Sequence, residues 1–266
     1  MEQKSRKTVG LILGSGGGRG MAHIGVIKTL QKYNIPIDYI SGSSIGAVIG
    51  AYYALNLEVD SIEKIFKSIF KKPFWLLDFK TKNSFIGNKK IFQLMKYNLY
   101  GEKTFDDTKI PLRIASTNID SGDSYIFNNG KIVDAVIPSM TIPGILPIVE
   151  KDNMHLVDGG LSNALPIKPL IQEFNPDVLI IVDLYTPKLK PLKNYSIKSI
   201  FDRVYKLYIS KLSKINIIDC DREHIILNPD TDENFENLTF KNIDKNIKIG
   251  EDEVEEKIEE IKKLCL

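Results

Sequence analysis

The sequence predicts an α/β protein with a mainly parallel central sheet. Two successive units at its start, 9–33 and 37–57, each combine a short apolar stretch, a glycine-containing loop and residues with helical spacing. A further stretch, 177–184, is almost continuously apolar, which is the pattern of a strand buried on both faces. Strands that alternate with helices in this way form parallel sheets whose strands are connected by crossover helices.

The first unit predicts a strand at 9–13, a glycine loop at 14–20 and a helix at 21–33. Its apolar residues follow helical spacing, as shown by Ile24, Ile27, Leu30 and Tyr33. The second unit predicts a strand at 37–41 and, after another glycine-containing turn, a helix at 47–57.

Later stretches predict further helices and strands but no domain boundary. Helical patterns occupy 62–70, 89–100, 131–139, 197–218 and 251–264. Strand patterns occupy 111–118, 124–127 and 154–157. We therefore expect one domain over 1–266, with a core that carries the motifs at about 8–185 and a helical C-terminal part at about 186–266.

The composition excludes several classes of protein. The chain has 266 residues, of which 43% are hydrophobic and 26% charged, as in an ordinary globular domain. A net charge of +2 gives no overall basic field, so we expect no nucleic acid partner. Cys220 and Cys265 lack CxxC spacing and the three histidines are scattered, so we expect no metal and no cofactor. Without a signal-peptide pattern or a long apolar run, we expect a cytoplasmic protein, with peripheral contact to a membrane as a further expectation.

The sharpest motif is G-x-S-x-G at 42–46, in which Ser44 is the central serine. It follows a predicted strand and opens a predicted helix, which is the context that a nucleophile on a sharp turn requires. Gly42 and Gly46 leave space around this turn, and the start of the helix favours a developing negative charge. The alternative interpretation is a tight turn without catalysis.

The glycine loop Gly14–Gly20 is the second motif. A dinucleotide fingerprint fails, because the required third glycine falls on Arg19 or on Met21. A phosphate-binding P-loop fails as well, because no Gly-Lys-Ser/Thr follows. The loop fits an oxyanion hole, in which backbone N–H groups at a helix start bind a negative charge and Arg19 orients the loop. Its candidate residues are Gly16, Gly17, Gly18, Arg19 and Gly20. A purely structural glycine turn is the alternative.

An activated serine needs a base, and the third motif, Asp158-Gly159-Gly160, offers one. An ordinary aspartate has a pKa near 3.9, so the surroundings of Asp158 would have to raise it. His23 and His155 are the alternative bases, although neither lies in a local signature. From the residues alone, the choice among these three stays open.

Taken together and in this order, the three motifs resemble the patatin-like phospholipase family of bacterial type, from about Thr8 to Tyr185. The resemblance rests on four stretches, 11–26, 110–118, 142–147 and 156–166. It implies a three-layer α/β/α fold with a mainly parallel central sheet.

The resemblance also implies a site and an activity. Ser44 would be the nucleophile and Asp158 the base of a Ser–Asp dyad. Gly17 and Gly18 would be the leading oxyanion donors, and His23 would not be catalytic. The implied function is a lipid acyl hydrolase that cleaves fatty-acyl esters of phospholipids or lysophospholipids. A thioesterase or acyltransferase shares the same acyl-enzyme. A non-catalytic lipid- or protein-binding module would be expected to lack Ser44 or Asp158.

Two other segments combine apolar and basic residues. The stretch 66–85 gathers aromatic residues and lysines, and contains the single tryptophan, Trp75. It is either a cover over an acyl pocket that contacts a membrane or a helical hairpin that covers the core. The stretch 197–217 is either a solvated surface helix or a membrane or partner face. The run 251–263 predicts an ordinary amphipathic helix.

Overall fold

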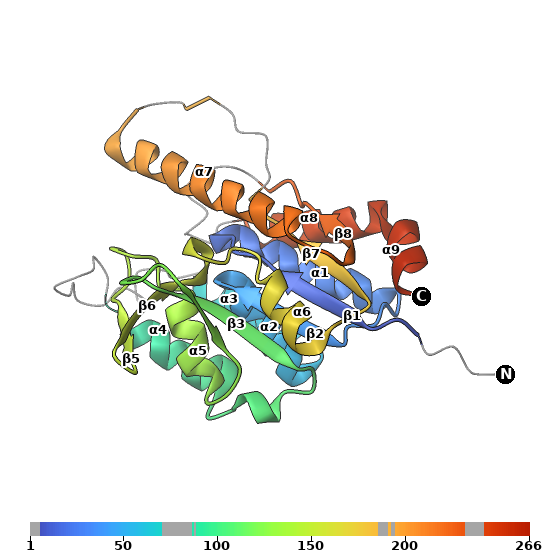
Figure 1. Cartoon of the computed structure of the whole chain (residues 1–266), viewed down its shortest axis with the longest axis horizontal. Coiled ribbons are helices and arrows are strands. Elements are labelled where there is room, and N and C mark those ends of the chain that lie inside the picture. The colour runs from blue at the N-terminus through green and yellow to red at the C-terminus, as the bar shows by residue number, and fades with distance from the viewer. Residues whose placement is uncertain (1–5, 71–86, 88, 186–190, 193–194, 232–241) are drawn as a thin grey trace.

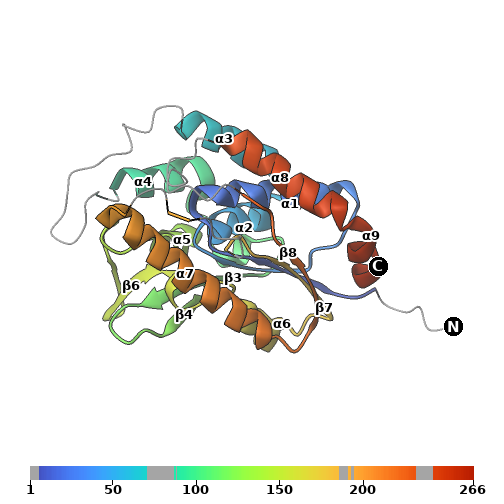
Figure 2. The same cartoon turned by 90° about the horizontal axis from the view of Figure 1, so that it is seen from above.

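The computed structural model describes residues 6–70, 87, 89–185, 191–192, 195–231 and 242–266. In this part of the chain, helices lie on both faces of one central sheet (Figure 1), and the view from above separates the layers (Figure 2). The fold is the expected three-layer α/β/α arrangement. The stretch 66–85, for which a cover over an acyl pocket and a helical hairpin were the alternatives, lies outside the described residues except for 66–70, where Phe66 is buried in the core.

The sheet has a parallel centre and an antiparallel edge. The described strands are β1 (Val9–Leu13), β2 (Tyr39–Ser43), β3 (Leu112–Asn118), β4 (Ser124–Phe127), β5 (Val149–Lys151), β6 (Met154–Asp158), β7 (Val178–Val182) and β8 (Glu223–Leu227). Their order is β5-β6-β3-β2-β1-β7-β8, and β4 also pairs with β3. The pairs from β3 through β2, β1 and β7 to β8 are parallel, whereas β4, β5 and β6 pair in antiparallel fashion. The carboxyl ends of the parallel strands therefore meet at one edge, where sites of open α/β sheets form.

Helices connect and cover these strands. They are α1 (Met21–Lys32), α2 (Ile45–Asn56), α3 (Asp60–Phe70), α4 (Lys89–Leu94), α5 (Ile132–Ser139), α6 (Ile167–Phe174), α7 (Ile197–Ile218), α8 (Ile243–Glu256) and α9 (Ile258–Cys265). Short turns η1 (Gly17–Gly20) and η5 (Gly159–Leu161) follow β1 and β6. None of the helices in the described ranges combines the length and the apolar composition needed to cross a bilayer.

Alternating residues of the central strands enter two different cores. Leu11 and Leu13 of β1 pack in the larger core with apolar residues of α1, α2 and α8. Ile12, between them, packs with Leu170 of α6 and Leu179 of β7 in a second core on the other face. Because successive side chains of a strand point to opposite faces, a strand covered on both sides must be apolar throughout.

The C-terminal part differs most from the sequence-based expectation. It was expected to be helical, but β8 joins the central sheet parallel to β7. The helix expected at 251–264 begins earlier, as α8, and breaks at Lys257 before α9. The short elements β5 and α6 were also not predicted, and β2 lies two residues later than expected. Such short elements form through partners distant in sequence, so their local pattern is weak.

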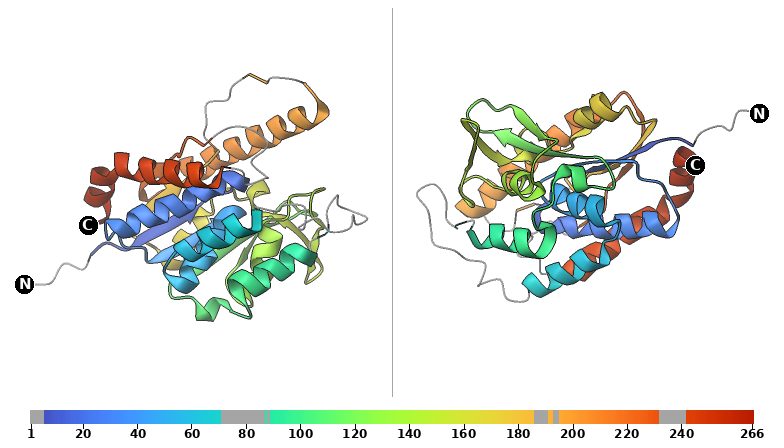
Figure 3. Two further views of the ribbon diagram at one scale, coloured as in Figure 1. Left: turned by 180° about the vertical axis from the view of Figure 1, so that it is seen from behind. Right: turned by 90° about the horizontal axis from the view of Figure 1, so that it is seen from below.

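Close backbone contact between α8 and α1 fixes the C-terminal part against the core (Figure 3). A Cβ atom on Gly25 of α1 would lie 1.9 Å from the carbonyl oxygen of Ile247, and one on Gly250 of α8 would lie 2.1 Å from that of Ala22. Only glycine permits this approach. Hence α8 packs directly on the helix that follows the glycine loop.

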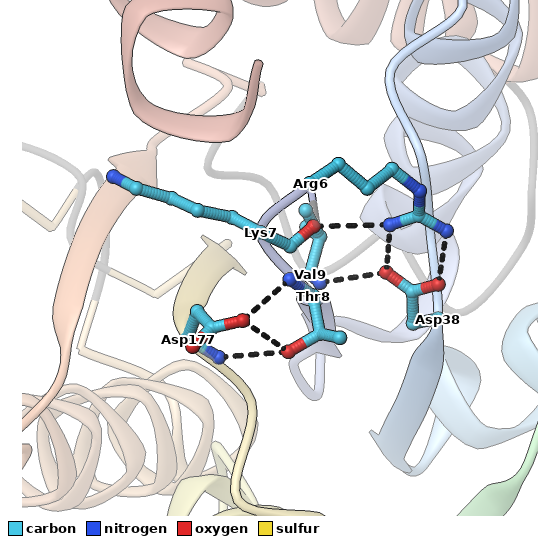
Figure 4. A network of polar contacts seen from close by, with 6 residues as sticks. All are labelled: Arg6, Lys7, Thr8, Val9, Asp38 and Asp177. Atoms are coloured by element: carbon cyan, nitrogen blue, oxygen red, sulfur yellow. Dashed lines mark hydrogen bonds and ion pairs between the residues drawn. The ribbon is translucent and has the colours of Figure 1, made fainter. Parts of the chain in front are cut away.

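Polar contacts at the amino ends of three neighbouring strands hold the start of β1 (Figure 4). Arg6 donates to both carboxylate oxygens of Asp38, at 2.7 and 2.6 Å, and Asp38 also accepts from the N–H of Val9. Asp177 accepts from the N–H and the hydroxyl of Thr8, at 2.7 and 2.8 Å. These contacts join β1 to the chain just before β2 and β7, and so align the strands whose opposite ends carry the glycine loop and Ser44.

Candidate active site

Ser44 lies in a sharp turn between β2 and α2. Its backbone angles are φ 56° and ψ −125°, which non-glycine residues rarely adopt. Such strain costs about 1–3 kcal/mol and is found at nucleophile-bearing turns. A Cβ atom on Gly46 would lie 2.1 Å from the carbonyl oxygen of Leu13, and one on Gly42 would lie 2.7 Å from Cα of Ala47. Gly46 thus lets α2 begin directly against the end of β1, and Gly42 lets β2 turn tightly into α2.

Asp158, the last residue of β6, faces this serine. Ser44 Oγ donates a 2.7 Å hydrogen bond to Asp158 Oδ2, and the N–H of Gly160 donates to Oδ1 at 2.8 Å. The side chain is only 1% exposed. Burial raises the pKa of Asp158 to about 6, against the opposing effect of the two hydrogen bonds. A carboxylate with a raised pKa accepts a serine proton more readily than an ordinary aspartate does.

The glycine loop lies beside the serine, after β1. A Cβ atom on Gly20 would lie 2.3 Å from the side chain of Ile45, so the loop packs against the residue that follows Ser44. Gly17 has φ 56°, in the left-handed region that favours glycine. The N–H groups of Gly17 and Gly18 open the turn η1, where the first amides of a helix lack partners within it. Those amides suit a negatively charged oxygen.

Arg19 points into the protein and fastens the loop to the chain after β7. Its Nη1 donates to the carbonyl oxygen of Leu184 at 2.9 Å, and its Nε donates to that of Gly16 at 3.3 Å. The guanidinium also lies 4.1 Å from the centre of the Tyr185 ring. These contacts agree with the interpretation of Arg19 as a residue that orients the loop.

The two histidines considered as bases have other partners. His23 is fully buried, and its Nε2 donates to the carbonyl oxygen of Gly14 at 2.8 Å. Burial lowers the pKa of His23 to about 4. His155 is exposed, and its hydrogen bond to Asp120 raises its pKa. Asp158 is thus the candidate base that receives the hydrogen bond of Ser44.

Two supporting side chains were missed by the sequence analysis. Ser139 Oγ, at the end of α5, accepts the N–H of Ser44 at 2.9 Å. Asn246 Nδ2, on α8, donates to the carbonyl oxygen of Gly18 at 3.2 Å. They lie 95 and 228 residues from their partners. A signal in the local sequence could therefore not have identified them.

The chemistry of the site follows from these groups. It combines a serine hydroxyl on a strained backbone turn, a buried carboxylate with a raised pKa, and backbone amides at two helix starts. This combination suits nucleophilic acyl transfer. Within the described part of the chain, no group of three or more His, Cys, Asp or Glu side chains is placed to hold a metal ion.

A family model described as patatin-like phospholipase matches residues 11–171, a stretch that includes all three motifs. The chain belongs to the patatin-like phospholipase family. Its expected family and fold class are both confirmed. The solved structure of VipD from Legionella pneumophila has the same fold, with a TM-score of 0.51 over 96% of this chain and 67% of that chain, at 13% identity.

Two curated relatives of this patatin-like chain are much longer proteins. The protein named neuropathy target esterase sws of Drosophila melanogaster is 30% identical over 194 residues, which are 71% of this chain and 14% of that protein. The protein named lysophospholipase NTE1 of Meyerozyma guilliermondii is 30% identical over 197 residues, 72% of this chain and 14% of that protein. The chain thus spans about one-seventh of these relatives.

Ser15 is a serine within the glycine loop, directly after Gly14. Its hydroxyl is buried and donates to Ser43 Oγ at 3.0 Å. A Cβ atom on Gly160 would lie 2.7 Å from Ser15 Oγ, so the serine also packs against the turn after Asp158. Ser15 therefore connects the glycine loop to the two segments that carry Ser44 and Asp158.

Proposed function

We propose that this patatin-like protein is a lipid acyl hydrolase that cleaves fatty-acyl esters of phospholipids or lysophospholipids through a Ser44–Asp158 dyad. The observation that carries the proposal is the buried 2.7 Å hydrogen bond from Ser44 Oγ to Asp158 Oδ2, at a strained turn beside a glycine loop. Membership of a phospholipase family and the names of the two relatives, an esterase and a lysophospholipase, support the substrate class.

The first half of the reaction forms an acyl-enzyme. Asp158 accepts the proton of Ser44 as Oγ attacks the ester carbonyl carbon. The tetrahedral intermediate then expels the alkoxide of the lipid, which takes the proton from Asp158 and leaves as an alcohol. In the second half, Asp158 accepts a proton from water, which attacks the acyl carbon and releases the fatty acid as Ser44 recovers its proton.

The negative charge of each intermediate lies on the former carbonyl oxygen. We assign its stabilisation to the N–H groups of Gly17 and Gly18, at the start of η1. One such donor is worth about 3 kcal/mol of the barrier. The start of α2, directly after Ser44, adds a favourable dipole at the same point.

We also propose that the chain is one domain and that it works in the cytoplasm at the surface of a membrane. Contact between β8 and β7, and between α8 and α1, supports a single unit from the glycine loop to the C-terminal helices. A lipid ester substrate supports work at a membrane surface, since such lipids reside there.

Hydrolysis of a chromogenic fatty-acyl ester tests the proposal. The proteins compared are the wild type, Ser44→Ala, Asp158→Asn and a control pair on the exposed β3–β4 turn, Ser121→Ala and Asp123→Asn. Both site variants are expected to lose about three orders of magnitude or more in kcat, because members of a nucleophile–base pair act as a unit. The control pair should match the wild type.

Labelling with a fluorophosphonate separates the remaining outcomes. We expect covalent modification of the wild type at Ser44 and none of Ser44→Ala. Full activity of Asp158→Asn would overturn the dyad. A folded wild type that neither hydrolyses the ester nor takes the label would instead favour a binding module. Labelling with preferential transfer of the acyl group to another acceptor would favour an acyltransferase.

A further inference from the structure

One face of α7 exposes a row of large apolar side chains. Figures 1 and 2 show this helix on the outside of the molecule. Ile197 is 89% exposed, Phe201 61% and Val204 59%. The exposed apolar residues of the helix are Ile197, Ile200, Phe201, Val204, Leu207, Tyr208, Ile215 and Ile218. Most recur at three, four or seven residues, as in 197/201/204/208/215, which places them on one side of the helix.

The opposite side of α7 packs next to the candidate site. Ile209 is fully buried with Ala164 and Tyr185, whose ring lies under Arg19 of the glycine loop. From the exposed side, the hydroxyl of Tyr208 also reaches this region and donates to the carbonyl oxygen of Leu161 at 2.6 Å, in the short turn that follows Asp158. The exposed face is therefore about one helix diameter, roughly 10 Å, from the elements that carry the reacting groups.

The charge of α7 indicates which partner its exposed face fits. The helix contains five basic residues and a single acidic one, Asp202. Lys211 and Lys214 are exposed on the same side as the apolar row. A basic amphipathic helix of this kind binds anionic lipid surfaces, in which its apolar side chains enter the interface and its lysines reach the headgroups.

We propose that the exposed face of α7 docks the protein on an anionic lipid surface and so presents the Ser44–Asp158 site to lipid esters. This inference rests on the proposed function for its purpose, although docking itself is measured without hydrolysis. A second copy of the chain suits the face less well. If two copies paired through this helix, the apolar row would form the buried contact between them. Lys211 lies within the row, four residues before Ile215 and three after Tyr208, so the contact would contain a charged side chain.

Vesicle sedimentation tests the docking face directly. All proteins carry Ser44→Ala, so that the vesicles stay intact. The parent should bind vesicles of phosphatidylcholine with phosphatidylserine, and bind vesicles of phosphatidylcholine alone about tenfold more weakly. The double variant Ile197→Ser/Phe201→Ser should lose binding by about a hundredfold, because two apolar anchors are removed. The double variant Lys211→Gln/Lys214→Gln should bind phosphatidylserine vesicles at least about threefold more weakly than the parent.

A matched control distinguishes docking through α7 from nonspecific adsorption of exposed apolar side chains to vesicles. Tyr97, which is 76% exposed in the π-helical segment Met95–Tyr100 that follows α4, provides the control variant Tyr97→Ser, and its binding should equal that of the parent. Unchanged vesicle binding by Ile197→Ser/Phe201→Ser would overturn the proposal. A parent that is dimeric by light scattering and becomes monomeric in this variant, with vesicle binding unchanged, would assign the face to a second copy.

Activity measurements keep this inference distinct from the proposed function. In proteins that retain Ser44, Ile197→Ser/Phe201→Ser should hydrolyse a soluble acyl ester like the wild type but lose at least about tenfold in activity on vesicle lipid. Normal vesicle binding by a wild type that hydrolyses neither substrate would leave docking intact and remove the proposed function. Equal loss on soluble and vesicle substrates would overturn the docking role.

Discussion

Ser43 and Asp158 pair with consecutive residues of β3, Ala115 and Ser116. Because β4 pairs with β3 over 114–117, β2 and β6 share the other edge of β3, one after the other. They run in opposite directions, since β2 is parallel to β3 and β6 is antiparallel. Their carboxyl ends therefore meet, and this meeting brings the hydroxyl of Ser44 to the carboxylate of Asp158.

The raised pKa of Asp158 predicts the pH dependence of the proposed reaction, in which Asp158 is the base. A base must be unprotonated, so kcat/KM for a neutral acyl ester should fall about tenfold per pH unit below about 6 and level off above 7. Burial of the Asp158 carboxyl group raises its pKa and so places the inflection near pH 6. A pH–rate profile of the wild type measures the inflection. His155→Gln serves as the control, because the exposed His155 also titrates above its usual pKa. A profile whose inflection disappears in this variant would contradict the assignment.

The same burial should make the ionised form of Asp158 lower the free energy of unfolding. Its pKa is about 6 in the folded protein and 3.8 for an ordinary aspartate, so the folded state binds more protons between these values. The contribution of Asp158 to the free energy of unfolding should then decrease as pH rises through this window, by about 3 kcal/mol in total, whereas buried His23, whose pKa is lowered to about 4, contributes in the opposite direction. Asp158→Asn has no proton to lose at this position.

Asp158→Asn is therefore expected to be as stable as the wild type near pH 4 and more stable above pH 7, by up to about 3 kcal/mol. Urea unfolding of both proteins across this range measures the difference. Asp123→Asn is a matched control, since Asp123 is exposed and its substitution should give no comparable change. A gap that stays constant with pH would show that burial of Asp158 carries no such cost.

The sequence predicted the individual motifs of the site but not that the fold brings them together. Ser44, Asp158 and the glycine loop each occur in a local motif, and the two strand–loop–helix units predicted the parallel centre of the sheet. The antiparallel approach of β6 could not be predicted, because Asp158 is 114 residues from Ser44 and its direction depends on pairing with β3. The strand β8 was missed for the same reason, since it is defined by β7.

Ser139 should act through the position of Ser44. Its hydroxyl accepts the N–H of Ser44, so Ser139→Ala leaves a buried donor without a partner, at a cost of about 1–3 kcal/mol. We expect kcat to fall about tenfold or more and thermal stability to decrease. Ser41→Ala is the control on β2, because Ser41 Oγ is buried without a hydrogen-bond partner among the described residues. Removal of the Ser41 hydroxyl should leave kcat and thermal stability nearly unchanged. Equal behaviour of the two variants would contradict a positioning role for Ser139.

Asn246 links α8 to the glycine loop that we propose as the oxyanion hole. Its Nδ2 donates to the carbonyl oxygen of Gly18 and lies in a buried position, beyond the stretch 11–171 that matches the family model. Asn246→Ala should loosen this loop and lower kcat about tenfold with little change in KM, because the loop amides are proposed to bind charge that develops only during the reaction.

A control on the same helix tests whether this effect is specific. Lys248→Ala removes only exposed ion pairs with Glu251 and Asp252, which contribute little, so its kinetics should match the wild type. Inhibition by a fluorophosphonate adds an independent readout, since its rate should fall in Asn246→Ala in parallel with kcat. A variant that loses thermal stability but keeps both rates would show that Asn246 supports packing of α8 alone. Parallel loss of both rates with KM unchanged would establish that α8 positions the glycine loop for the reaction.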